Sequence, residues 1–253
     1  MKIIMKNVLN LFSRIVEKLS QLGCSLAGYL MMITAAFSVY EIIMRSLFNK
    51  PTSWAIEITT YILIWFGFIS MAYIQREERH IRVDLVINQF SPKTRIIWEI
   101  ITLSMVLIFV ILLSCYGFIF FEEAFIRHET SFTILRTPMW IPKLAIPVGS
   151  VLLGLQIIKD IIDKFHLLSI TPLQQSPGTL RNPFFLASVF FILIGLSIAL
   201  IPRIPLAGLV LLMILLLFSG VHIFAALGLT GACGFFLLFG GLPALHQIPL
   251  VSF

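Results

Sequence analysis

Five charged or aromatic residues stand where their side chains could carry chemistry or hold a fold together. They are Arg45, Trp54, Glu57, Arg82 and Asp84. Arg45 closes one apolar stretch and Glu57 opens the next, on either side of a short turn, so both charges suit the dipoles of their helix ends. We predict that the two side chains form a salt bridge or share a hydrogen-bond network, and so lock a helical hairpin. Direct contact with a substrate or a coupling ion is the alternative.

Arg82 and Asp84 lie in a segment that mixes charged and apolar residues, QREERHIRVDLVINQF. One interpretation is a solvated loop with a short interfacial stretch. The other is that Arg82 and Asp84 anchor the fold. The spacing of the residues leaves both interpretations open.

Signatures of catalysis are missing from the sequence. The five histidines are scattered without metal-ligand spacing, and the three cysteines are far apart in apolar runs. No glycine-rich phosphate loop follows a strand pattern, and no serine nucleophile elbow occurs. We therefore expect no catalytic residue, no cofactor and no metal site.

The composition indicates a membrane protein. Of 253 residues, 59% are hydrophobic and 12% are charged, and the mean hydropathy is +1.02; an ordinary soluble domain has about 25% charged residues. A soluble enzyme, a disordered chain and an outer-membrane barrel all conflict with these values. The expected fold is an all-α polytopic membrane protein in a lipid bilayer. The net charge of +6 fits loops rich in Lys and Arg better than binding of nucleic acid.

Gaps between charged residues locate the membrane spans, because a span needs about 20 mainly apolar residues. We predict spans near 22–47, 54–75, 96–121, 139–163 and 184–201. Twelve of the 18 Lys and Arg residues fall in the N-terminal tail, the second loop and the segment after the fourth span. This bias predicts a cytoplasmic N-terminus.

Patterns at the helix ends predict several boundaries. Residues 4–19 form an amphipathic helix, which either lies on the inner leaflet or simply extends the first span. Thr52 or Ser53 can cap the second span, and Pro92 can start the third. The polar linker 170–182 divides the chain. We expect a four-span unit at 1–165, a linker and connecting span at 166–203, and a further apolar unit at 204–253.

The apolar unit at the C-terminal side has no charged residue after Arg203. We expect two short elements with a turn at Ser219-Gly220, although one long broken helix is the alternative. Four small residues follow helical spacing on the second element and should form an exposed, flat face for a partner helix. They are Ala225, Gly228, Gly231 and Ala232.

Four ordered segments resemble the small membrane subunit of TRAP transporters (tripartite ATP-independent periplasmic transporters, the DctQ-like subunit). The segments are Arg45–Glu57, His80–Leu85, Thr137–Trp140 and Ile146–Gly149. One departure is Ile56, where the family commonly has an acidic residue before the glutamate. Residues 220–229 resemble the beginning of the large DctM-like subunit of the same transporters, with His222 where that family usually has proline.

This resemblance implies a small scaffold subunit fused to the start of a large subunit, in a bacterial inner membrane. Its partners would be the large membrane subunit and a periplasmic solute-binding protein, and its process the ion-driven uptake of carboxylates or related organic acids. We expect the chain to stop before the large-subunit helices that hold substrate and ions, so that it transports nothing alone. A stand-alone structural or regulatory membrane protein is the alternative, and an integral membrane enzyme fits less well.

Overall fold

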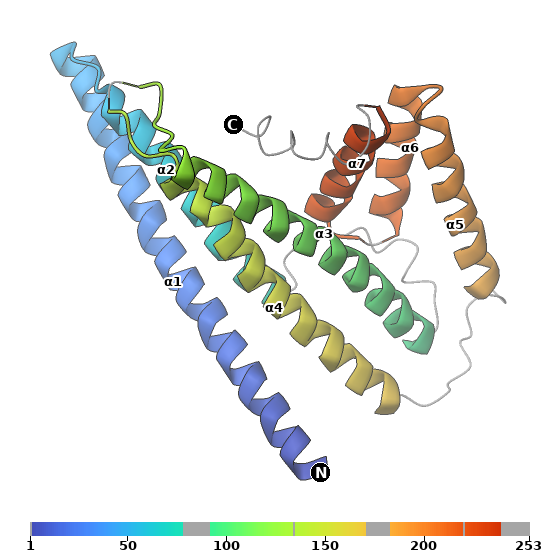
Figure 1. Cartoon of the computed structure of the whole chain (residues 1–253). Coiled ribbons are helices and arrows are strands. Elements are labelled where there is room, and N and C mark those ends of the chain that lie inside the picture. The colour runs from blue at the N-terminus through green and yellow to red at the C-terminus, as the bar shows by residue number, and fades with distance from the viewer. Residues whose placement is uncertain (1, 78–91, 134, 171–182, 220, 239–253) are drawn as a thin grey trace. The chain divides into compact units, whose positions relative to one another are not determined.

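The computed structural model describes residues 2–77, 92–133, 135–170, 183–219 and 221–238. These residues form seven helices and no β-strand beyond one isolated bridge between Thr130 and Pro138 (Figure 1). The helices are α1 (Lys2–Phe48), α2 (Ser53–Arg76), α3 (Pro92–Ile126), α4 (Trp140–Ile170), α5 (Pro183–Leu200), α6 (Pro205–Phe218) and α7 (Ile223–Leu238). The predicted all-α fold is confirmed.

Within the described part of the chain, four helices are long and apolar enough to cross a membrane. They lie at Leu11–Phe48, Trp54–Arg76, Pro92–Ile126 and Trp140–Ile170, where the sequence predicts the first four spans. The third begins at Pro92, as expected for a proline at the first helical position. The chain is a polytopic helical membrane protein.

The N-terminal segment continues into the first span without a break, because α1 is one helix of 47 residues. No proline interrupts it. This favours the interpretation that the amphipathic segment extends the first span over a separate helix lying on the leaflet.

The chain divides into two compact units. Unit 1 comprises Met1–Arg79 and Val110–Lys159, and unit 2 comprises His80–Phe109 and Asp160–Phe253. In unit 1, α1 packs against α2 along a buried stripe of mostly small and polar residues. A β-carbon on Gly23 would lie 3.1 Å from the carbonyl oxygen of Ile69, so the two backbones approach closely.

Helix α4 presents its buried face with a spacing of three and four residues, the pattern of a helix packed on one side. Gly149 on this face touches the backbone of α2, and its missing β-carbon would lie 2.5 Å from the oxygen of Phe68. A β-carbon on Gly117 of α3 would lie 2.6 Å from Ile146 of α4. Glycines thus set the distances between these helices.

In unit 2, α6 packs against both α5 and α7. The two elements expected after Arg203 are confirmed, since α6 ends at Phe218 and α7 begins at Ile223. They have 14 and 16 residues, fewer than the roughly 20 of a bilayer span.

The small residues of α7 do not form the fully exposed face that the sequence predicts. Ala225 is completely buried, and the ring of Phe109 occupies the space next to Gly228, where a β-carbon would lie 2.2 Å from it. Only Gly231 has open space in place of its β-carbon. The prediction was wrong for Ala225, which is buried, and for Gly228, which faces Phe109 of α3 in the same unit.

Candidate functional site

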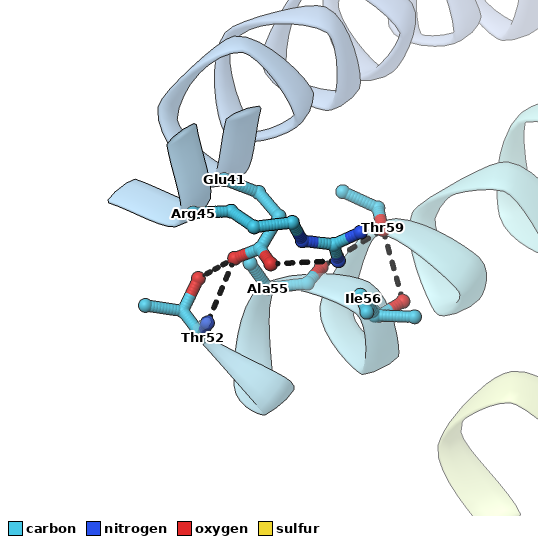
Figure 2. A network of polar contacts seen from close by, with 6 residues as sticks. All are labelled: Glu41, Arg45, Thr52, Ala55, Ile56 and Thr59. Atoms are coloured by element: carbon cyan, nitrogen blue, oxygen red, sulfur yellow. Dashed lines mark hydrogen bonds and ion pairs between the residues drawn. The ribbon is translucent and has the colours of Figure 1, made fainter. Parts of the chain in front are cut away.

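Three of the sequence-predicted residues, Arg45, Trp54 and Glu57, lie at one end of unit 1. This end carries the turn between α1 and α2 and the loop between α3 and α4, and it is called the loop-bearing end. Glu41 in the last turns of α1 accepts a hydrogen bond of 3.0 Å from the Arg45 guanidinium (Figure 2). It also accepts bonds from the backbone N–H of Thr52, at 3.0 Å, and from the Thr52 hydroxyl. Only 10% of the Glu41 side chain is exposed, against 61% of the Arg45 side chain. A buried carboxylate therefore holds the turn between the helices.

The turn itself is built by the residues that end α1. Asn49 adopts the left-handed conformation, with φ 51°, which asparagine tolerates better than most residues. The N–H of Lys50 bonds the carbonyl of Met44 at 3.1 Å. Thr52 stands at the N-cap of α2, as predicted, but its hydroxyl bonds Glu41 and caps no N–H of α2.

Trp54 joins the same two helices through ring contacts. Its ring lies 5.9 Å from that of Phe37, nearly perpendicular to it, and 5.8 Å from that of Tyr40. Edge-to-face aromatic pairs of this kind add to the free energy of burial. Trp54 is thus a packing residue of the hairpin.

Glu57 holds a second loop to the same end of unit 1. It is 6% exposed and accepts hydrogen bonds from the hydroxyls of Thr133 and Thr137 and from Tyr61 at 2.8 Å. A buried carboxylate must be compensated by donors, and here all of these donors are hydroxyl groups. Glu57 therefore fastens the loop between α3 and α4 onto α2.

The loop between α3 and α4 folds back on itself like a short hairpin. The N–H of Ser131 bonds the carbonyl of Thr137, and the N–H of Met139 bonds that of Glu129, each at 2.9 Å. Phe132 at its tip is fully exposed. The loop is thus held at its base while its tip projects.

A stripe on α2 continues the contact along the start of α4. Tyr61 lies one turn after Glu57, and its hydroxyl reaches the sulfur of Met139 at 3.6 Å. Trp65 lies one turn further, and its Nε1–H bonds the carbonyl of Ile141 at 3.1 Å. Residues four apart share a helix face, so this stripe fixes the register of α2 against α4.

A third buried charge ties the loop to α4. Lys143 is 5% exposed, and its Nζ lies 2.5 Å from Glu129 and 3.8 Å from the ring centre of Phe120. The ion pair and the cation–π contact together compensate the buried ammonium group. Lys143 thus fastens the second end of the loop.

The structure corrects the predicted partner of Arg45. Arg45 pairs with Glu41 on its own helix, and Glu57 is compensated by hydroxyl groups, so the two predicted partners belong to separate networks. Glu41 and Arg45 lie four residues apart on one helix, so their side chains meet whatever the conformation of the turn. A pair across the turn would also need the turn to bring its two side chains together. Arg82 and Asp84 lie outside the described residues.

Several residues of the site were missed by the sequence reasoning. Thr133, Glu129 and Lys143 carried no predicted role, and Thr137 was only part of a motif. Lys143 offered a signal, since a lysine within an apolar helix must find a partner. Thr133 offered none, because hydroxyl residues are ordinary in loops.

The buried charged side chains at this end hold the loops to the helices. Glu41 binds Thr52, Glu57 binds Thr133 and Lys143 binds Glu129, so each of these buried charged groups is engaged by neighbouring groups of the chain. Among the described residues, no group of three or more His, Cys, Asp or Glu side chains could hold a metal ion.

Comparison with known proteins agrees with this picture. Residues 34–167 match the family described as Tripartite ATP-independent periplasmic transporters, DctQ component. Two relatives carry the name C4-dicarboxylate TRAP transporter small permease protein DctQ. The relative from Vibrio cholerae serotype O1 is 28% identical over 102 residues, and that from Rhodobacter capsulatus is 29% identical over 100 residues.

Each of these matches covers 40% of this chain and 44% of the relative, so the chain spans less than half the length of the curated relatives it matches. The family match covers more than half of the chain. It includes the last third of α1, all of α2 and α3, most of α4 and the loops that Glu41 and Glu57 hold. The chain therefore belongs to the family of the DctQ component of tripartite ATP-independent periplasmic transporters.

Proposed function

We propose that this chain is the small permease subunit of a TRAP-type secondary transporter, acting as a scaffold for a large membrane subunit. The observation that carries the proposal is the use of the buried charges at the loop-bearing end. Glu41, Glu57 and Lys143 fasten loops to helices, which supports a stiff body at this end. A stiff partner is what a moving transport subunit needs to move against.

The transported solute is proposed to be a carboxylate or a related organic acid, delivered by a periplasmic binding protein and driven by an ion gradient. The names of the two relatives, which specify C4-dicarboxylates, support this class. We also propose that the segment 204–253, joined through 166–203 to the unit 1–165, corresponds to the beginning of a large permease subunit. The apolar helices α6 and α7 support that assignment.

Reconstitution tests the transport role directly. Proteoliposomes would receive the large permease subunit and the binding protein, with or without this chain, and uptake of labelled C4-dicarboxylates would be measured under an imposed sodium gradient. We expect uptake only when all components are present and none with this chain and the binding protein alone. Uptake by this chain with the binding protein alone would contradict the scaffold role.

A gene-neighbourhood comparison separates this proposal from a stand-alone structural or regulatory protein. The proposal expects genes for a binding protein and a large permease subunit beside the gene for this chain. Repeated absence of both in related genomes would favour the stand-alone alternative.

Orientation is also proposed, with the N-terminus on the cytoplasmic side of the inner membrane. Single cysteines at Glu77 and Phe132, both exposed, would be introduced after removal of the three native cysteines. A membrane-impermeant reagent added from the periplasmic side should label position 132 and spare position 77. The reverse pattern would overturn the orientation.

A further inference from the structure

A groove of about 340 Å³ lies between α1 and α2 at the hairpin. Its lining is partly apolar and partly polar: Phe37, Ser38, Glu41, Ile42, Arg45, Ser46, Ala55, Ile56 and Thr59. The volume is at the lower end of the range for sites that hold small molecules. The contacts that hold the hairpin together do not fill this space.

The groove runs from the membrane surface into the hydrocarbon. Arg45 is three residues before the end of α1, and the turn that follows contains exposed Lys50, so this level must reach the lipid headgroups. Phe37 lies eight residues earlier, about 12 Å further along the helix. The polar mouth and the apolar floor therefore match the headgroup and the upper acyl region of one lipid.

The charges at the mouth favour an anion. Between Phe37 and Thr59 both carboxylates, Glu41 and Glu57, are buried, whereas both cations, Arg45 and Lys50, are exposed. The Arg45 side chain extends from α1 across the first turns of α2 toward Thr59 (Figure 2). One of its N–H groups bonds Glu41, and a guanidinium has five N–H groups suited to phosphate oxygens.

The same arrangement disfavours a headgroup that carries an amine. The oxygens of Glu41 already accept bonds from Arg45 and Thr52, so the groove offers an ammonium group no free carboxylate. We propose that this groove binds an anionic phospholipid, with its phosphate on Arg45 and its acyl chain along Phe37, Ile42 and Ile56. The exposed side chains of Ile42 and Ile56 then form the apolar rim against which the chain lies.

Native mass spectrometry of the full chain tests this proposal. The protein would be released from nanodiscs of phosphatidylcholine doped with phosphatidylglycerol, and the lipids retained per molecule would be counted. We expect retention of one phosphatidylglycerol in preference to phosphatidylcholine. Arg45→Gln should weaken this retention about tenfold, because charge-assisted hydrogen bonds to phosphate are lost.

Arg127→Gln is the matched control, since it removes an exposed arginine of unit 1 that does not line the groove. It should leave retention unchanged. Ser38→Phe provides a second test, because it fills the groove from an exposed position and keeps every charge; it should also abolish retention. Circular dichroism and gel filtration would establish that each variant is folded.

Three results would overturn the proposal: unchanged retention in both Arg45→Gln and Ser38→Phe, an equal loss in Arg127→Gln, or equal retention of phosphatidylcholine. Displacement of the lipid by soluble glycerol 3-phosphate would also overturn it, since the groove would then bind a small anion. If Arg45→Gln does not fold, Ser38→Phe decides, because it leaves the Glu41 network intact.

Discussion

At its loop-bearing end, unit 1 is joined by buried charged side chains, whereas in its middle the same helices meet through glycines. Glu57 and Lys143 act at the end, and Gly149 brings the backbones of α4 and α2 together in the middle. The two regions belong to one body and share two helices. Their chemistry differs because their surroundings differ.

In the hydrocarbon, apolar surface gains nothing by leaving lipid, so helices associate through close packing that small residues allow. At the membrane surface, loops are exposed to water and need directional contacts to hold one position. A carboxylate with several hydroxyl donors supplies such contacts. The comparison suggests that glycines set how close the helices lie, and that buried charges set where the loops lie.

The largest effect should come from Gly149→Ala. Its new β-carbon would lie 2.5 Å from the backbone oxygen of Phe68, and a backbone atom cannot rotate away as a side chain can. We expect a loss of about 3 kcal/mol or more, the upper end of the usual cost of overpacking. The melting temperature and the yield of monodisperse protein in detergent would measure it.

Gly154→Ala on the same helix is the control for this substitution. The nearest atom to its new β-carbon is a side-chain carbon of Val110 at 3.5 Å, an ordinary contact. Alanine is a better helix former than glycine by roughly 0.5–1 kcal/mol, so stability should stay equal or rise. Equal losses in both variants would refute the role of close backbone contact.

An intermediate effect is expected for Glu57→Gln. It keeps the size of the side chain but removes the charge that engages Thr133 and Thr137, which should cost about 2 kcal/mol. Since the loop would be released, trypsin should cut faster at Arg127 and Arg136. The rate of cleavage, followed by mass spectrometry, measures that release.

Exposed Glu123→Gln near the end of α3 is the comparison for Glu57→Gln, because it makes the same change in charge. It should leave the rate of cleavage unaltered. If Glu57→Gln also leaves cleavage unaltered, Glu57 does not position the loop.

The smallest effect is expected for Lys143→Met. Methionine keeps the apolar stem, and Glu129, whose side chain is 34% exposed, stays hydrated when its partner is lost. We expect a loss of about 1 kcal/mol, from the ion pair and the contact with Phe120 together. Thermal unfolding would measure this loss. A loss of stability as large as that of Gly149→Ala would mean that the Lys143 charge stabilises more of unit 1 than the loop alone.

The sequence was sufficient for features that depend on local pattern. Long apolar runs located the four spans, and Ser219 marked the break between α6 and α7, because run length and helix breakers act within a few residues. Contacts between segments that are distant in the sequence could not be predicted from local pattern. Thr133 reaches Glu57 across 76 positions, and nothing in its local pattern distinguishes it.

The two wrong predictions have a common origin. Arg45 was assigned to Glu57 although Glu41, four residues away, offered a partner on the same helix. The α7 face was assigned to an absent partner although Phe109 of α3 covers Gly228. In each case the prediction came from the local sequence pattern, whereas the actual partner depends on which helix faces lie together.

Helix α1 is continuous over its whole length and can therefore move as a rigid rod. Its 47 residues extend about 70 Å as a helix, more than twice the roughly 30 Å of the hydrocarbon core. With no proline to act as a joint, a tilt of about 10° at one end displaces the other by about 12 Å for a rod of this length. A tilt of the hairpin held by Glu41 is therefore passed on to the opposite end of α1 as a displacement of this size.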